Sequence, residues 1–177
     1  MESTLATGLI LISPILLVRF LLLSYLGKEA LKRAAFFPPT EGIERIAYLT
    51  NILTTFLLLI IPFFLKIRLQ GFLSISGLCL IILALVLYTV SIIQFARPNS
   101  TGLTISGLYN ISRNPMYVAF FLYFLACCML TGSWILLIIL LVFQISVHFL
   151  IISEERWCKR QFDKAYLDYA AKVRRYI

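Results

Sequence analysis

Residues 107–117 form a polar, turn-rich segment between two long apolar runs, and they hold the strongest candidates for chemistry. Asn114 followed by Pro115 is typical of a helix start, because Asn is a good N-cap and Pro fits the first helical position. The first turn of such a helix offers free backbone N–H groups and a positive dipole end, and Arg113 stands directly before it. These groups predict an anion site. An alternative remains open, in which Arg113 anchors a membrane edge and Asn114 is an ordinary cap.

A second polar group lies about forty residues further along the chain. Gln144, His148 and Glu155 are spaced at i, i+4 and i+11, which places them within about 40° of one another on a helix. Glu154 and Glu155 form an acidic pair where a membrane edge is usually basic, so we expect Arg113 or a cationic ligand to pair with them. We expect His148 to bond to a neighbouring helix more readily than to take part in catalysis.

Aromatic side chains accompany both polar groups, and they suit a flat ring or a sulfonium ion. An anion site, a carboxylate pair and these rings together match a zwitterionic, aromatic-bearing cofactor. The fingerprints of soluble cofactor-binding proteins and of zinc proteases are absent, and the four cysteines show no C-x-x-C spacing, which argues against a metal site or a disulfide scaffold. The aromatic candidates are Tyr109, Tyr117, Tyr166 and Tyr169.

The composition predicts an all-α integral membrane protein. The 177 residues are 61% hydrophobic and have a mean hydropathy of +0.95, far above soluble domains. Five spans use most of the chain, so we expect one membrane domain, with residues 1–95 as scaffold and residues 96–177 carrying the cofactor motifs. The net charge of +8 lies between spans and not in a nucleic-acid patch, and no obligate protein partner is evident.

The five predicted spans differ in how they begin and end. The N-terminal run has no basic region before it and is interpreted as a retained span. Its Arg19 either snorkels to the headgroups, the interpretation we favour, or faces the bundle interior. Residues 27–45 form a polar connection, which is either a simple linker, the interpretation we favour, or part of a substrate entrance. The predicted spans cover residues 5–26, 46–65, 72–95, 115–130 and 134–152.

The positions of the basic residues predict the orientation. Four Lys and Arg residues fall in 27–45, two in 96–115 and seven after Ile152, thirteen in all on one side, against Lys66 and Arg68 on the other. Such a bias places the motifs and the C-terminus in the cytoplasm and the N-terminus outside. The residues after Ile152 repeat apolar side chains at helical spacing, which predicts an amphipathic cytoplasmic helix that either rests on anionic headgroups or folds back as a lid.

At these residues the sequence resembles the membrane-embedded methyltransferases of the isoprenylcysteine carboxyl methyltransferase and phospholipid methyltransferase group. That family has a G-x-Y segment, then R-H-P-x-Y, a hydrophobic hairpin, E-E-x-x-L, and a tail of the form F-G-x-x-Y-x-x-Y followed by basic residues. The resemblance covers about residues 97–177. The matching residues are Gly107-Leu108-Tyr109, Arg113-Asn114-Pro115-Met116-Tyr117, Glu154-Glu155-Arg156-Trp157-Cys158 and Phe162-Asp163-Lys164-Ala165-Tyr166-Leu167-Asp168-Tyr169.

The resemblance implies that S-adenosylmethionine is held by these motifs and that a lipophilic acceptor reaches it from the bilayer. It implies catalytic positions at Arg113, Asn114 and Glu155. This chain departs from the family where Asn114 replaces histidine, Cys158 replaces leucine and Asp163 replaces glycine, and the first change argues against a titrating base at that position. The cofactor-binding residues carried over by the resemblance are Gly107, Tyr109, Arg113, Asn114, Pro115, Tyr117, Glu154, Glu155, Tyr166, Tyr169 and Arg174.

The sequence therefore predicts methyl transfer from S-adenosylmethionine to a lipophilic acceptor at the cytoplasmic membrane face. The acceptor is left open among a prenylated cysteine carboxylate, a phospholipid amine, and a small hydrophobic thiol or alcohol. One rival is an NADPH-dependent membrane reductase of sterol-like substrates, because such enzymes share related C-terminal architecture. A second rival is a non-enzymatic membrane module, which the change at Asn114 favours most.

Overall fold

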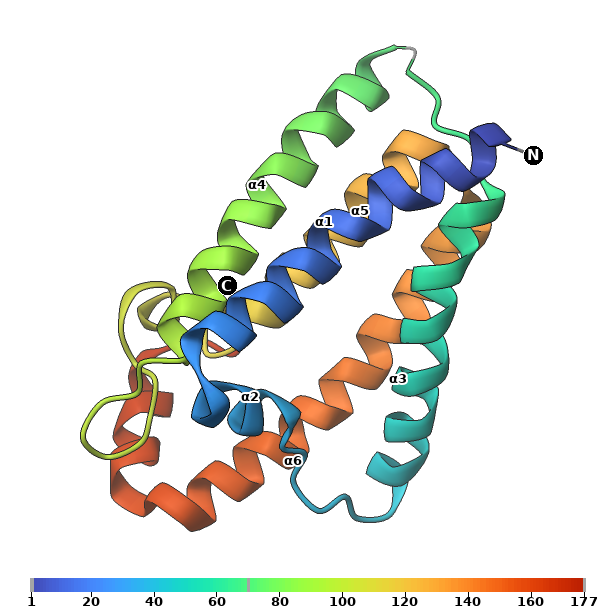
Figure 1. Ribbon diagram of the computed structural model, residues 1–177. Helices are drawn as coiled ribbons and strands as arrows, with labels where there is room; N and C mark the ends of the chain where they lie inside the picture. Colours follow the sequence, from blue (N-terminus) through green and yellow to red (C-terminus); the bar gives the residue numbers. More distant parts are fainter. Residues whose placement is uncertain (1, 70, 177) are drawn as a thin grey trace.

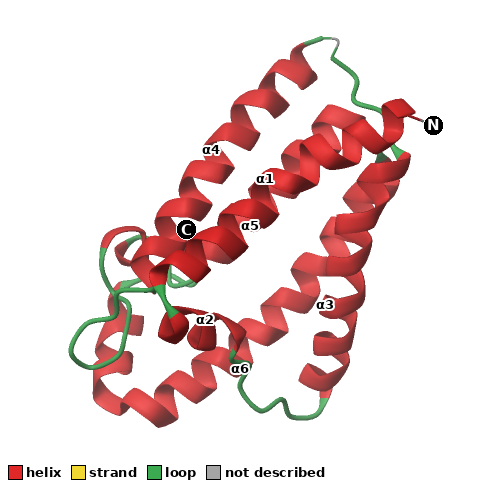
Figure 2. Ribbon diagram, in the orientation of Figure 1, coloured by secondary structure: helices red, strands yellow, loops and turns green. Residues whose placement is uncertain are grey.

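The structure is a computed structural model that describes residues 2–69 and 71–176, and its regular elements in those residues are helices (Figure 2). Two of the eight are single 3₁₀ turns. In chain order they are α1 (Glu2–Leu26), α2 (Lys28–Ala35), α3 (Ile43–Ile60), η1 (Ile61–Phe64), α4 (Phe72–Phe95), η2 (Gly107–Asn110), α5 (Pro115–Thr131) and α6 (Trp134–Lys172).

The long helices pack in two groups, with α1, α4 and α5 side by side and α3 along the first half of α6 (Figure 1). Large side chains of α5 fill the space between the groups, and Tyr123 and Phe124 are fully buried. The Tyr123 hydroxyl donates a hydrogen bond of 2.6 Å to the Leu11 carbonyl of α1, so a polar atom in this apolar core is satisfied. These contacts hold the scaffold on which the polar motifs rest.

The hairpin between α5 and α6 follows from three residues. Gly132 adopts a left-handed conformation, with φ of 62°, and ends α5. Ser133 then caps α6, because its hydroxyl accepts a hydrogen bond of 3.3 Å from the Leu136 N–H. The tight turn predicted at residues 131–133 is confirmed, and it sets the last two long helices antiparallel.

Apolar side chains cover the outside of the helices, as a lipid-facing surface requires. Four described helices, α1, α3 with η1, α4 and α6, are long and apolar enough to cross a membrane, and α5 is an apolar helix of 17 residues. The all-helical membrane fold is thus confirmed, with four to five spans. Its second apolar segment starts slightly before the predicted boundary, at Ile43, and Pro62 turns its last residues into η1.

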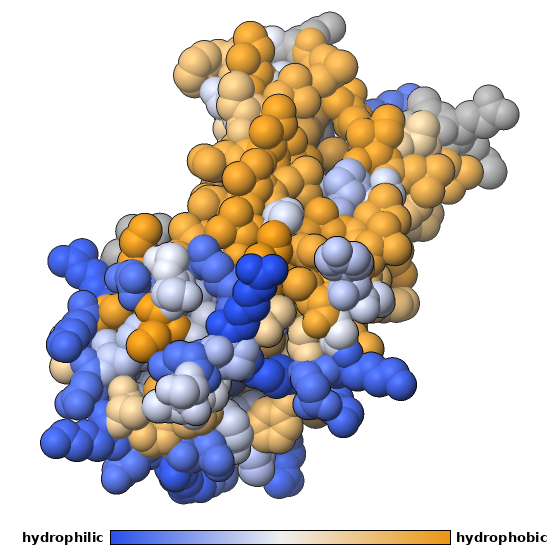
Figure 3. All heavy atoms as spheres, turned by 60° about the vertical axis from the view of Figure 1, so that its left-hand side comes forward, coloured by the Kyte–Doolittle hydropathy of each residue, from blue (hydrophilic) through white to orange (hydrophobic). Residues whose placement is uncertain are grey.

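Polar residues gather at one end of the molecule, where Figure 3 shows blue spheres below an orange, apolar body. The connection after α1, the segment 96–114 and the end of α6 all lie at this end (Figure 1). The three segments with thirteen basic residues therefore share one end of the bundle. The arrangement agrees with the charge bias of the sequence, which predicts the side of the membrane.

The last part of α6 departs from the predicted fold. The sequence predicts a separate helix after Ile152, whereas α6 continues unbroken past that residue and turns only at Asp163, where φ is 42° and ψ is −121°. After this turn the chain folds back toward the start of α5 (Figure 1). An isolated parallel bridge between Ser112 and Arg174 joins the two segments. The fold-back matches the lid interpretation of this helix.

Candidate active site

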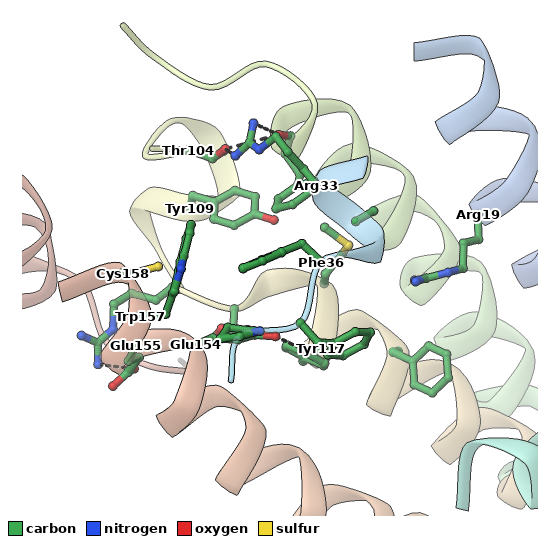
Figure 4. Close-up of a pocket in the computed structure, with 18 of the residues that line it drawn as sticks. Arg19, Arg33, Phe36, Thr104, Tyr109, Tyr117, Glu154, Glu155, Trp157 and Cys158 are labelled. Carbon is green, nitrogen blue, oxygen red and sulfur yellow. Dashed lines mark hydrogen bonds and ion pairs between the residues drawn. The ribbon is translucent and has the colours of Figure 1, made fainter. Parts of the chain in front are cut away.

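A cavity of about 770 Å³ lies at the polar end and extends between the helices. Its walls combine side chains from the motifs at residues 107–117 and 154–169 with apolar side chains of α1, α3, α5 and α6. This volume falls within the range of ligand-binding pockets in proteins. Figure 4 shows it between Arg19 of α1 and the acidic pair of α6. Of the predicted site residues, those that line it are Tyr109, Arg113, Asn114, Tyr117, Glu154, Glu155, Tyr166 and Tyr169.

The start of α5 is held by the C-terminal segment. Pro115 occupies the first helical position, as predicted, and is buried. The Asn114 side chain does not cap the helix. Its amide donates to the Arg175 carbonyl at 3.0 Å, and the Arg113 backbone N–H donates to the Arg174 carbonyl at 2.9 Å. The side-chain cap predicted at Asn114 is therefore wrong, because the amide binds the chain terminus instead.

Glu155 is the centre of a buried ion-pair cluster. Its side chain is 9% exposed and pairs with Arg113 at 3.1 Å. Arg175 completes the cluster through two hydrogen bonds of 2.9 and 2.8 Å to the two carboxylate oxygens. The predicted pairing of the acidic motif with Arg113 is confirmed. Arg174, which is predicted to bind the cofactor, has an exposed side chain and does not line the cavity.

Glu154 has a different environment from its neighbour. Its carboxylate accepts a hydrogen bond of 2.7 Å from the Tyr117 hydroxyl, and it lies beyond the apolar part of α6, which ends at Ile152. Burial raises the pKa of Glu154 to about 7, the Tyr117 bond opposes this rise, and the nearby Glu155 charge adds to it. The cavity thus contains a carboxyl group that changes charge near neutral pH.

The aromatic residues meet across the fold-back. The Tyr169 hydroxyl donates to the Tyr109 carbonyl at 2.7 Å, and the rings of Tyr166 and Tyr169 contact edge to face. Tyr109 is buried, and desolvation raises the pKa of its hydroxyl above the ordinary value. Gly107 does not line the cavity. It has a φ of 63° and lies against the Gln94 side chain, so a side chain there has no room.

His148 and Gln144 lie outside the cavity wall. His148 Nδ1 is 2.8 Å from the Tyr176 hydroxyl, so its partner lies in the C-terminal segment after α6 and not in the neighbouring helix that was expected. The amide oxygen of Gln144 is buried and has no partner among the described residues. Of the three polar residues predicted on one helix face, Gln144, His148 and Glu155, only Glu155 therefore lines the cavity.

The connection between α1 and α3 contributes site residues that sequence reasoning missed. It is not a simple linker, because α2 and the residues after it line the cavity. Arg33 lies 4.7 Å over the Phe95 ring and donates to the Phe95 carbonyl at 3.0 Å, while Phe36 contacts the Trp157 ring. The signal available was the amphipathic pattern of residues 28–35, with two aromatic residues directly after it.

A strong ion pair fixes the far end of that connection. Glu44 is buried and receives hydrogen bonds from both terminal nitrogens of Arg156. Arg156 belongs to the acidic-pair motif of α6, so α3 and the motif are locked together. This contact joins the first half of the chain to the second at the cavity rim.

Arg19 occupies a position that the sequence did not predict. Snorkelling to the headgroups was expected, but its side chain lines the cavity and Nη1 donates to the Tyr88 hydroxyl of α4 at 3.1 Å. Figure 4 shows the guanidinium pointing into the same space as Tyr117 and Phe36. The expectation is wrong because a polar partner and an open cavity exist inside the bundle.

Comparison with known families identifies the family to which this chain belongs. The family model described as phospholipid methyltransferase matches residues 72–165, just over half of the chain. The chain belongs to the phospholipid methyltransferase family. This match confirms the resemblance, and it makes the protein a membrane methyltransferase. Searches of the curated proteins and of the solved structures return no match.

The matched region of this methyltransferase contains the two central motifs. It spans the start of α5 with Arg113 and Asn114, and it includes Glu154 and Glu155. It ends at residue 165, before Tyr166 and the fold-back. α1, α2 and α3 precede it, so Arg19 and the entire α1–α3 connection are features of this chain outside the matched region.

Proposed function

We propose that this methyltransferase transfers a methyl group from S-adenosylmethionine to a lipophilic acceptor. The observation that carries the proposal is a single cavity with two kinds of wall. One wall holds the ionic and aromatic motifs at the polar end, and the other holds apolar side chains of the membrane helices, such as Leu16, Leu59 and Phe120. A water-soluble donor and a membrane-soluble acceptor can therefore meet in one space.

The residues present fit the cofactor. Arg113 lines the cavity, and its buried Nε has no hydrogen-bond partner among the described residues, so a donor is left for a carboxylate. Glu154 offers the opposite charge, and Tyr109, Tyr166 and Trp157 offer aromatic faces. A group that is anionic at one end, cationic at its sulfur and aromatic in its base satisfies all three.

In methyl transfer, the residues of this chain act mainly by positioning the donor and the acceptor. When bound, S-adenosylmethionine supplies an electrophilic methyl group on a sulfonium centre. Arg113 fixes the anionic end, and Tyr117 holds the Glu154 carboxylate toward the cavity. The rings of Phe36 and Trp157 pack against each other in a tilted arrangement and exclude water there. For an amine acceptor, which must first lose a proton, Glu154 with a pKa of about 7 suits proton transfer.

The site faces the cytoplasm in this proposal. The supporting observation is the excess of basic residues in the segments that form the polar end, and cytoplasmic loops carry such an excess. S-adenosylmethionine is a soluble cytoplasmic metabolite, so the same side gives the cavity its donor. The membrane would supply the acceptor from the apolar side.

Calorimetric titration of the purified protein with S-adenosylhomocysteine and with NADPH tests the proposal. We expect binding of the first and none of the second. Tyr117→Phe removes the hydroxyl that orients Glu154 and should weaken S-adenosylmethionine binding, whereas Tyr25→Phe, at a residue 87% exposed, should not. Binding of NADPH alone would support the reductase instead, and binding of neither would support a non-enzymatic module.

A further inference from the structure

Arg19 is a cation inside the membrane part of the cavity. It lies in α1 seven residues before the helix end at Leu26, and its partner Tyr88 lies seven residues before the end of α4 at Phe95. At 1.5 Å per residue, both are roughly 10 Å inside their helices. The side chain therefore turns inward to a bundle contact and not outward to the headgroups.

The charge of Arg19 has no counter-ion among the residues that the structure describes. Its hydrogen-bond partner is the neutral Tyr88 hydroxyl, and the ion pairs of the described residues do not include it. A guanidinium has five N–H donors, and this contact uses one. An arginine inside a membrane helix is costly unless it pairs with an anion, so one that faces a cavity marks a functional site.

The other two arginines of the cavity wall are more fully paired, although only Arg113 has an anionic partner. Arg113 pairs with Glu155, and Arg33 donates to the carbonyls of Phe95 and Gly102. Arg19 is surrounded instead by apolar wall residues, including Ile15 and Phe20. Its surroundings favour a ligand that carries a negative charge on an apolar chain.

We propose that Arg19 binds the anionic group of the lipophilic acceptor, with Tyr88 orienting the guanidinium. This inference rests on the proposed methyl transfer, and it narrows the acceptor to an apolar molecule with a phosphodiester or a carboxylate. Both anions match the planar fork of a guanidinium. A neutral hydrophobic thiol or alcohol lacks that group and is disfavoured. Arg19 is a specificity residue here and lies apart from the acidic motif (Figure 4).

Binding of three single-chain probes tests the proposal with protein in an uncharged sugar detergent. Dodecyl methyl phosphate and dodecanoate carry the two candidate anions, and dodecanol is their neutral counterpart. Ligand-induced shifts of the thermal unfolding midpoint give their affinities. We expect at least one anion to bind wild type tenfold or more tightly than dodecanol, and the tighter anion identifies its source as phospholipid or carboxylate.

Variants assign the effect to Arg19. Arg19→Gln should remove the preference for the anion, and Arg19→Lys should keep part of it. Arg68→Gln, an exposed arginine in the short loop before α4, should bind like wild type. Equal binding of anion and alcohol by wild type, or an unchanged preference in Arg19→Gln, would overturn the proposal.

A separate titration with S-adenosylhomocysteine keeps the two proposals distinguishable. We expect Arg19→Gln to bind it as wild type does, because Arg113 and the aromatic side chains of the motifs hold that ligand. A wild-type protein that prefers the anionic probe but binds no S-adenosylhomocysteine would contradict the methyl-transfer proposal and not the anion site. Loss of S-adenosylhomocysteine binding in Arg19→Gln would overturn the acceptor role, since Arg19 would then serve the cofactor.

Discussion

Glu154 and Glu155 are neighbours in sequence with opposite electrostatic situations. Glu155 is neutralised by two arginines, whereas Glu154 accepts a hydrogen bond from the neutral Tyr117 hydroxyl and has a pKa raised to about 7. One carboxylate therefore builds the site, and the other remains available to a ligand. Because arginines pair with Glu155 and not with Glu154, the same motif can both hold the fold together and act on a ligand.

The raised pKa of Glu154 predicts how cofactor binding depends on pH. An ionised Glu154 attracts the positive sulfur of S-adenosylmethionine but gains nothing from the neutral sulfur of S-adenosylhomocysteine. We expect the affinity ratio of these two ligands to rise about tenfold between pH 6 and 8, about 1.4 kcal/mol. Calorimetric titration across this range measures it. The ratio should be flat in Glu154→Gln, and a pH-dependent ratio in that variant would assign the effect to another group.

The same group predicts a stability change in the ligand-free protein. Because burial raises its pKa from 4.5 to about 7, Glu154 favours folding below its ordinary pKa, and this contribution is lost as the pH rises through about 7. The thermal midpoint of wild type should therefore fall relative to Glu154→Gln between pH 4.5 and 8. A constant difference between the two proteins would contradict the shifted pKa.

Glu155 should matter through the cluster it holds. Removing one member of a buried ion pair typically costs 3–5 kcal/mol, so we expect Glu155→Gln to lower S-adenosylhomocysteine affinity a hundredfold or more by releasing Arg113. Glu41→Gln is the matched control, because Glu41 is 61% exposed and lies 3.8 Å from its arginine partners, a pair worth at most about 1 kcal/mol. Equal, near-native affinities in two folded variants would refute the role.

At the scale of elements, the turn in α6 depends on an unfavourable residue. Asp163 has φ of 42° and ψ of −121°, a conformation that glycine adopts freely and that costs other residues about 1–3 kcal/mol. The resembling family has glycine at this position. The replacement is therefore unfavourable, because the residue type conflicts with the backbone that the fold-back requires.

Asp163→Gly should stabilise the fold-back. After the greater flexibility of glycine in the unfolded chain is subtracted, we expect a gain of about 1 kcal/mol, seen as a higher thermal midpoint. Asp163→Ala is the control, since it removes the same carboxylate without relieving the backbone. A gain of equal size in both variants would show that charge and not conformation limits stability here.

The helices could be predicted from the sequence, and the contacts between distant segments could not. Long apolar runs, Pro115 and the Gly132–Ser133 turn are local signals, and each marks a boundary that the structure confirms. The Asn114 side chain was misjudged because its partner, the Arg175 carbonyl, lies 61 residues away. Likewise, whether Arg174 or Arg175 binds Glu155 depends on how the C-terminal segment lies beside residues 112–114.

The cavity shows the same division between local and distant information. Most of the predicted site residues line it as expected, whereas Gly107, Pro115 and Arg174 do not. The contribution of α1 and α2 could not be predicted, because the neighbouring residues in the sequence do not distinguish an arginine that snorkels from one that faces a cavity. Arg19 is decided by Tyr88, which lies 69 residues later in the chain.

At the scale of the whole molecule, the charge distribution predicts the topology. The thirteen basic residues at the polar end should lie in the cytoplasm. A reporter fused after residue 177 should read cytoplasmic, and one fused before residue 1 should read external. A reporter in the loop that contains Lys66 and Arg68 should also read external. An external C-terminus would separate the cavity from its soluble donor and would end the proposal.

A cavity with one aqueous and one membrane wall also determines how the reaction rate should be described. The donor is counted in moles per litre, but the acceptor is counted as a mole fraction of the bilayer, because it approaches by diffusion in two dimensions. Adding inert lipid at fixed total acceptor should therefore slow turnover by surface dilution, while the Michaelis constant for the donor keeps its bulk value. Membrane composition, and not only metabolite level, would set the flux through this enzyme.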